Sequence, residues 1–267
     1  MRLNLLSKQK AKQYNNMNVK SRSRCRTLSG LVFLMGALPI VGQELTIDWG
    51  TDFFPSGPVI TSSGAPIELG DGSFTDDGFT IELGVFDGGF TPTTGNTESW
   101  VTNWRALDAI TANDPDSRDN LVSSGGGNAT FSGTDLIDST NRSLSLDAIV
   151  DNDFVFSQGT QTYVFVRNGD TPEAGTEWLL YTRAGENDDW TIPFVSPESH
   201  SPADDLTWSV TDANTAIWGA INGETIGGGE SMAINPNGLI QTFTFVPEPS
   251  SALLVTLGGL ALLRRRR

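Results

Sequence analysis

Short hydrophobic runs separated by turn-forming residues are the feature that most constrains the fold of this 267-residue chain. Between residues 45 and 246, runs rich in Val, Ile, Thr, Phe and Trp alternate with Gly, Asn and Asp, as is typical of strands joined by turns. These runs lie at residues 45–49, 59–62, 79–86, 129–132, 144–150, 163–167, 178–182, 206–210, 216–220 and 240–246. The run at 79–86 alternates in the manner of a half-buried strand. The pattern predicts an all-β fold, an antiparallel, jelly-roll-like sandwich.

One short helix is expected within this β pattern. Asn96 or Thr97 would cap its first turn. Four apolar residues then fall on one helical face: Trp100, Trp104, Leu107 and Ile110. We interpret this face as part of the core rather than as a cofactor contact. The sequence has no internal period of about 20 to 50 residues, which disfavours a solenoid.

Charge is distributed unevenly along the chain. Residues 44–248 hold all 32 acidic residues and only five basic ones, all arginine, so this stretch has a net charge of −27. Nucleic-acid binding is excluded, because a phosphate backbone requires a basic face. Solubility through mutual repulsion is one interpretation of the charge, and attraction of divalent cations or basic partners is the other.

The amino-terminal residues 1–43 are expected to form a signal peptide. Residues 1–27 contain eight Lys or Arg and no acid, and an uncharged apolar run follows at 28–41. The basic region is unusually long, so Met17 is an alternative start, and cleavage is expected near residues 42–43. An uncleaved membrane anchor is the alternative interpretation.

The last twenty-two residues have three parts in a fixed order. The first is an extended, exposed segment made rigid by two prolines: Val246, Pro247, Glu248 and Pro249. Residues 250–263 are uncharged and Leu-rich, and as a helix they would span roughly 21 Å of the ~30 Å hydrocarbon core. The chain ends on a basic cluster that would hold the terminus on the cytoplasmic side: Arg264, Arg265, Arg266 and Arg267. A buried or amphipathic helix with a basic end is the alternative.

Residues 246–267 resemble the PEP-CTERM sorting signal of Gram-negative bacteria, the substrate tag of exosortase enzymes. The resemblance implies export, transient anchoring in the inner membrane and cleavage by an exosortase-type enzyme near the Pro-Glu-Pro segment. It also implies delivery to the cell surface or to an extracellular polysaccharide matrix. Glu248 would be recognised by the processing enzyme and would not be catalytic in this chain.

Parts of the body also resemble a group of uncharacterised exported PEP-CTERM proteins. The first part reads Ile-Glu-Leu-Gly-Val-Phe at 81–86 and Gly-Phe-Thr-Pro-Thr at 89–93, followed by Asn96, Trp100 and Trp104. The second reads Tyr-Val-Phe-Val at 163–166, Thr-Glu-Trp-Leu-Leu at 176–180 and Trp-Thr-Ile-Pro at 190–193. This resemblance implies a shared fold and no particular chemistry.

Residue types that usually carry catalysis are sparse. The single histidine, His200, lies in a Ser-, Pro- and Asp-rich stretch, and no Gly-x-Ser-x-Gly motif presents a nucleophile to it. The single cysteine, Cys25, precedes the amino-terminal apolar run, so neither an ordinary zinc site nor a disulfide is expected in the body. We therefore predict that the chain is not an enzyme.

Acidic loops and tryptophans are the remaining candidates for binding. Calcium prefers six to eight hard oxygen ligands, and the weak candidates for it are Asp151, Asp153, Asp188 and Asp189. Solvated turn residues are the alternative interpretation, and no other cofactor is expected. An exposed tryptophan could stack on a sugar, although we expect most of the seven to be core residues: Trp49, Trp100, Trp104, Trp178, Trp190, Trp208 and Trp218.

Three functional hypotheses follow. The leading one divides the chain into a signal peptide (1–43), an acidic β-sandwich body (44–245) and a sorting signal (246–267), and describes an exported, non-catalytic surface or matrix protein. Its partners would be an exosortase-type enzyme, the inner membrane and extracellular polysaccharide. The alternatives are a calcium-assisted carbohydrate-binding module and an extracellular glycan-active enzyme, which needs two carboxylates about 5 to 10 Å apart.

Overall fold

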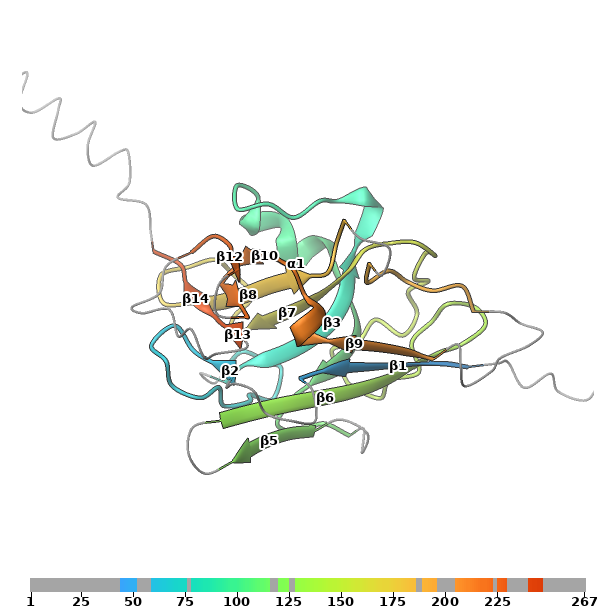
Figure 1. Cartoon of the computed structure of the whole chain (residues 1–267), viewed down its shortest axis with the longest axis horizontal. Helices are drawn as coiled ribbons and strands as arrows, with labels where there is room; N and C mark the ends of the chain where they lie inside the picture. Colours follow the sequence, from blue (N-terminus) through green and yellow to red (C-terminus); the bar gives the residue numbers. More distant parts are fainter. Residues whose placement is uncertain are drawn as a thin grey trace, which may run out of the picture. The chain divides into compact units, whose positions relative to one another are not determined.

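The computed structural model describes residues 44–51, 59–75, 78–115, 120–124, 128–185, 189–195, 205–222, 225–229 and 240–246, all within the unit Val41–Arg267. These residues are mostly β, with antiparallel sheets and one short α-helix, α1 (Trp100–Asn103) (Figure 1). The strands are β1 (Leu45–Gly50), β2 (Val59–Ile60), β3 (Thr80–Phe86), β4 (Trp104–Ile110), β5 (Asn120–Ser124), β6 (Asn128–Ile137), β7 (Thr162–Arg167), β8 (Glu177–Thr182), β9 (Leu206–Ser209), β10 (Thr215–Trp218), β11 (Ala220–Ile221), β12 (Thr225–Ile226), β13 (Ile240–Gln241) and β14 (Phe243–Thr244). Short 3₁₀ turns are η1 (Asp87–Gly89), η2 (Thr97–Ser99) and η4 (Val210–Asp212).

A six-stranded sheet, here called the central sheet, has the order β10-β8-β7-β3-β4, and β14 also pairs with β8. All of its pairings are antiparallel. Strand β3 lies between β4 and β7, with Ile81 opposite both Ile110 and Val166. Side chains on such strands alternate between the two faces of the sheet, so β3, β4, β7 and β8 each contribute to two different clusters.

Two smaller sheets contain the remaining strands. One has the order β5-β6-β1-β9, and the other has the order β12-β11-β13-β2. Strand β1 pairs antiparallel with β6 but parallel with β9, and β13 pairs parallel with β2. These two parallel pairings depart from the purely antiparallel sandwich that the sequence predicts. They are possible because each pair is joined by a long stretch of chain, as a parallel crossover requires.

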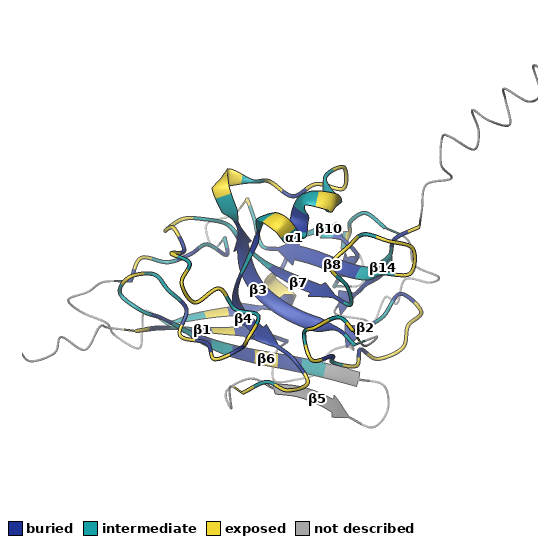
Figure 2. Cartoon of the chain, turned by 180° about the vertical axis from the view of Figure 1, so that it is seen from behind, coloured by how far each residue is buried: buried dark blue, intermediate teal, exposed yellow. Residues whose placement is uncertain are grey.

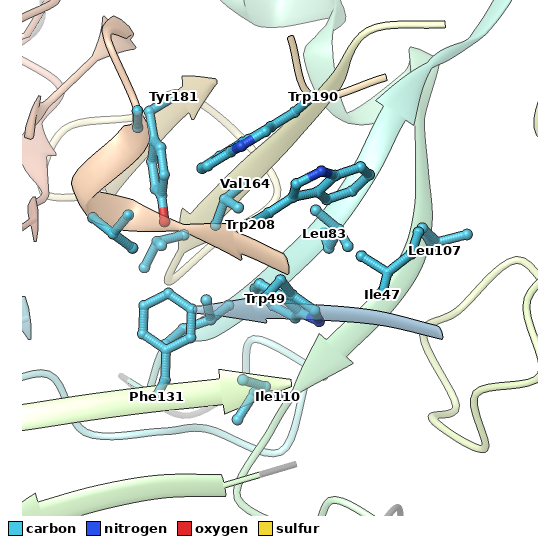
Figure 3. Packing of buried hydrophobic residues seen from close by; sticks show 14 of the residues in the cluster. Ile47, Trp49, Leu83, Leu107, Ile110, Phe131, Val164, Tyr181, Trp190 and Trp208 are labelled. Carbon is cyan, nitrogen blue, oxygen red and sulfur yellow. The ribbon is translucent and has the colours of Figure 1, made fainter. Parts of the chain in front are cut away.

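An inner cluster of apolar side chains fills the space between the central sheet and the β5-β6-β1-β9 sheet (Figure 3). Ile47 and Trp49 of β1 meet Leu83 of β3 there. Val164 of β7 and Tyr181 of β8 lie in the same cluster, and the Tyr181 hydroxyl points into it. Full burial of one such apolar side chain stabilises the fold by about 1.5 to 3 kcal/mol, so this cluster is a principal source of stability.

The opposite face of the central sheet carries a second cluster, here called the outer aromatic layer. The segment around α1 lies over this face (Figure 2). Trp178 stacks on Trp100 with ring centroids 5.7 Å apart and meets Phe165 edge-on at 5.1 Å. The layer consists of Phe86, Trp100, Trp104, Ala106, Phe165, Trp178, Leu180, Trp218, Ala220, Phe243 and Phe245.

Strand β3 is therefore buried at all seven positions. The prediction of a half-buried strand at 79–86 is wrong in this respect. Ile81 and Leu83 face the inner cluster, while Phe86 belongs to the outer aromatic layer. The polar position that suggested a solvent face is Glu82, which is fully buried in an ion pair with Arg167.

The helix expected to carry Trp100, Trp104, Leu107 and Ile110 on one face ends at Asn103. Strand β4 begins at Trp104, so the four residues do not share a face. Trp100 and Trp104 join the outer aromatic layer, whereas Leu107 and Ile110 join the inner cluster. The pairing of β4 with β3 overrides the helical spacing, and the ladder shifts register between Leu83 and Gly84.

The strand predicted at 144–150 is also wrong. This segment lies in a loop in which the alternation is reversed, with buried Ser143, Ser145 and Asp147 and with Leu146 68% exposed. The Ser143 hydroxyl donates to Asp135 of β6 at 3.0 Å. Hydrogen bonding to a buried carboxylate allows these polar side chains to occupy the buried positions of the loop. The sequence pattern predicts leucine at those positions.

The expected signal peptide and the expected carboxy-terminal helix at 250–263 lie outside the described residues. Among the helices that are described, none is long and apolar enough to cross a membrane.

Candidate functional site

The residues expected to form the sorting signal begin where the described packing ends. Phe245 is only 9% exposed, and its ring stacks on Trp218 with centroids 4.1 Å apart. The next residue, Val246, is 54% exposed. Pro247, Glu248, Pro249 and the four terminal arginines lie outside the described residues. The described chain thus leaves the outer aromatic layer directly before the Pro-Glu-Pro segment.

The calcium candidates are not gathered into one site. Asp151 and Asp153 are exposed in a turn closed by the Phe154 amide, which donates to the Asp151 carbonyl at 2.8 Å. Asp189 is half-buried and lines a cavity of about 500 Å³ beside Arg183, and Asp188 lies outside the described part of the chain. Within that part, no group of three or more His, Cys, Asp or Glu side chains could hold a metal ion.

All seven tryptophans are described, and all are buried, with exposures between 0% and 8%. The prediction that most are core residues is confirmed. Five of the indole nitrogens also donate hydrogen bonds within the protein, those of Trp49, Trp100, Trp104, Trp178 and Trp218. Trp104 donates to Glu82 at 2.7 Å, for example, and Trp218 donates to the Phe243 carbonyl at 3.0 Å. A tryptophan platform for sugar stacking is therefore not available.

The buried carboxylate of Glu82 has a structural role. Its Oε1 accepts hydrogen bonds from the Thr80 hydroxyl at 2.7 Å and from Arg167 Nε at 3.0 Å. Its Oε2 accepts from Trp104 Nε1 at 2.7 Å and from Arg167 Nη2 at 3.2 Å. Arg167 also pairs with Asp170. Because both carboxylate oxygens are held by donors from three residues of the core, the group is fixed and inaccessible to a substrate.

A groove of about 510 Å³ opens where β3 ends and β7 begins. We call it the aromatic groove and define it by Phe86, Asp87, Phe90, Phe154, Gln161 and Tyr163. One wall comes from the end of β3 and η1, and the other comes from residues 154–163. Gly88 and Gly89 adopt positive φ angles of 64° and 74°, and this turn directs the chain around the mouth of the groove.

Aromatic rings and one ion pair shape the walls of this groove. Phe86 packs against Phe90 and against Tyr163, with centroid distances of 5.4 Å in both cases. Arg105 Nη2 lies 3.3 Å from Asp87 Oδ2, and the Arg105 guanidinium stands 5.7 Å from the Phe154 ring. Partial burial raises the pKa of the Tyr163 phenol above its ordinary value, so the hydroxyl stays protonated at neutral pH.

The groove contains one carboxylate rather than two. Of the twelve described residues that line it, only Asp87 carries a charge at neutral pH. A glycosidase needs a pair of facing carboxylates, so the groove does not assemble that constellation. Its lining combines aromatic rings with hydroxyl and amide groups, a combination that is typical of ligand pockets.

Sequence reasoning missed this groove. The Gly-Gly pair at 88–89 does indicate a turn after the strand. Nothing in the sequence indicates that residues 154–163 return to the same place, because that proximity depends on the pairing of β3 with β7. His200 lies outside the described residues.

Comparison with known proteins gives no relatives. No protein-family model matches the chain, no curated protein matches it, and no solved structure matches it.

Proposed function

We propose that this is an exported, non-catalytic cell-surface or extracellular-matrix protein, sorted through residues 246–267 and processed by an exosortase-type enzyme. In this proposal, residues 1–43 are a signal peptide and residues 44–245 are a jelly-roll-like sandwich that forms the mature protein. Residues 250–263 anchor the precursor in the inner membrane until cleavage near Pro247, Glu248 and Pro249.

The observation that carries the proposal is the order of three parts at the carboxy terminus: a Pro-Glu-Pro segment, an apolar run and four arginines. The position of the last packed residue supports it. Phe245 is the final member of the outer aromatic layer, and Val246 is exposed. Cleavage after Val246 would leave every described member of both hydrophobic clusters in the released body.

The surface chemistry of the body also supports a passive role. Of its five arginines, four are described, and each lies beside an acid: Arg105 with Asp87, Arg142 with Asp138, Arg167 with Glu82, and Arg183 with Asp212. The remaining acidic residues leave the body strongly negative. Such a surface repels polyanions and other copies of itself, which keeps an exported protein soluble.

The proposal is tested by fractionating cells that express the native chain or a Glu248→Ala variant. The native protein is expected at the cell surface or in the medium, and the variant is expected at full length in the inner membrane. Glu98→Ala, which removes an exposed glutamate of η2, is the matched control and should be exported normally. Export of Glu248→Ala at the native level would contradict the assigned role of the sorting segment.

A further inference from the structure

We propose that the aromatic groove binds a neutral saccharide, and that it does so with its own side chains rather than with tryptophan or calcium. This inference goes beyond the proposed function, because delivery to the cell surface requires no ligand. It depends on the described residues 85–91 and 154–163 and on the neighbouring Arg105, all of which lie within the described body.

The aromatic side chains that line the groove suit the apolar face of a sugar ring. Phe86, Phe90 and Tyr163 form one continuous cluster, in which Phe86 contacts both other rings. Phe90 and Tyr163 are only partly buried, so the free parts of their rings are available to a ligand. A flat ring with a polar edge combines apolar contact with hydrogen bonding, which is the combination that a sugar presents in return.

The polar side chains that line the groove suit the hydroxyl groups of the same ligand. Thr91, Ser157 and Thr160 line the groove and can both donate and accept hydrogen bonds. The Gln161 side chain is held in place, since its amide nitrogen lies 2.7 Å from both the Trp190 carbonyl and the Thr182 hydroxyl. A polar group fixed before the ligand arrives loses less entropy on binding.

Charge selects the class of saccharide. Asp87 is the one charged lining residue, and Arg105 lies 3.3 Å from it, so the groove carries no net charge. The body around it is strongly acidic and repels an anionic polymer. A purely apolar ligand is disfavoured as well, because it would bury the hydroxyl groups of Thr91, Ser157 and Thr160 without giving them hydrogen-bond partners. A neutral, hydroxyl-rich ligand meets all of these conditions.

The test is calorimetric titration of the full-length chain, kept in solution by a detergent without sugar groups. The probes are cellotetraose, maltotetraose and mannotetraose, with tetragalacturonic acid as an anionic molecule of the same length. At least one neutral tetrasaccharide is expected to bind, both with and without EDTA, and the anionic one is not expected to bind.

Two variants test whether the saccharide binds in the aromatic groove. Tyr163→Ala should weaken the affinity by about tenfold, since it removes an aromatic ring that lines the groove beside its polar side chains. Ser157→Trp adds a large side chain at an exposed lining position and should abolish binding without removing any core contact. Phe194→Ala removes a 62% exposed aromatic ring that does not line the groove, and it should leave the affinity unchanged.

If Tyr163→Ala fails to fold by circular dichroism, Ser157→Trp decides alone. Absence of binding to all three neutral tetrasaccharides would overturn the inference. So would native affinity in Ser157→Trp, equal binding of tetragalacturonic acid, or loss of binding in EDTA. None of these results depends on where the protein is delivered, so this inference and the proposed function fail separately.

Discussion

The two hydrophobic clusters on either side of the central sheet differ in composition. Eight of the eleven residues in the outer aromatic layer are Phe or Trp, whereas only seven of the twenty-six in the inner cluster are aromatic. The inner cluster lies between two sheets, where branched aliphatic side chains interdigitate at sheet spacing. The outer layer lies beneath a four-residue helix, α1, and the irregular chain next to it.

The chain buries the second face of the central sheet without a second full sheet. Irregular segments leave uneven gaps, and large flat rings fill such gaps with few side chains. The same arrangement exposes a rim, where Phe86 belongs both to the outer aromatic layer and to the aromatic groove. The groove thus arises at the place where the irregular cover ends.

The largest effect is expected from Trp178→Ala, which should destabilise the fold by about 4 kcal/mol through loss of three ring contacts. The neighbouring substitution, Leu179→Ala, removes a side chain from the inner cluster instead and should destabilise the fold by about 3 kcal/mol. Urea unfolding of both variants compares how much the two faces of strand β8 contribute to the stability of the fold. A clearly smaller loss for Trp178→Ala would show that the outer layer is not part of the cooperative core.

Glu82→Gln should destabilise the protein by about 3 kcal/mol, because it removes the charge of the buried partner of the Arg167 guanidinium. The comparison is Asp170→Asn, which removes the partner of Arg167 whose side chain is 57% exposed and should cost less than about 1 kcal/mol. Chemical denaturation at neutral pH distinguishes them. Equal effects would mean that the ion pair on the outer face of β3 is solvated.

Tyr181→Phe sharpens the description of the inner cluster. Within the described structure, the Tyr181 hydroxyl is buried and has no hydrogen-bond partner, so its removal should stabilise the fold by about 1 kcal/mol. Thermal unfolding checks this, and a loss of stability would reveal an unseen partner.

The same variant carries a pH prediction. Burial raises the pKa of Tyr181 in the folded state far above the value near 10 of the unfolded chain. As the pH rises past about 10, the unfolded state releases this proton first, so the native protein should lose stability there. Tyr181→Phe should lose less over the same range. Parallel curves for the two proteins would contradict the assigned burial.

The smallest effect is expected outside both clusters, at Asp138. Burial alone would raise the pKa of this carboxyl, but hydrogen bonds from Thr140 and Arg142 and the Arg142 charge outweigh it and lower the pKa. Its contribution is therefore present above pH 4 and is lost as the pH falls through the lowered folded-state value. Asp138→Asn should cost under about 1 kcal/mol at pH 7 and nothing near pH 2, as measured by urea unfolding. A larger cost would assign this exposed turn to the core.

Strand-forming runs were predictable where branched and aromatic residues alternate within one segment. Strands β1, β3, β7, β8 and β9 lie where the sequence predicts them, because each is a run of strand-forming residues bounded by turn-forming ones. Strand β4 was not predictable, since Trp104, Leu107 and Ile110 fit a helix equally well until β3 pairs with them. The strand prediction for the loop around Ser143 was wrong because the burial of Ser143 depends on its hydrogen bond to Asp135. Asp135 lies on β6, outside the segment whose hydrophobic pattern indicated a strand.

The candidate site was less accessible from sequence than the fold. The residues that we propose as the sorting motif are contiguous, so Pro247, Glu248 and Pro249 form a pattern that the sequence alone presents. The aromatic groove joins Asp87 to Tyr163 and Gln161 through sheet register, and no local pattern encodes that approach.

The most direct test of the account is the intact mass of the protein isolated from the native cell surface or medium. The account predicts a chain that begins near residue 43 and ends near Pro247, and that retains both hydrophobic clusters. A full-length chain in the cytoplasm, with Met1 or Met17 at one end and Arg267 at the other, would contradict it.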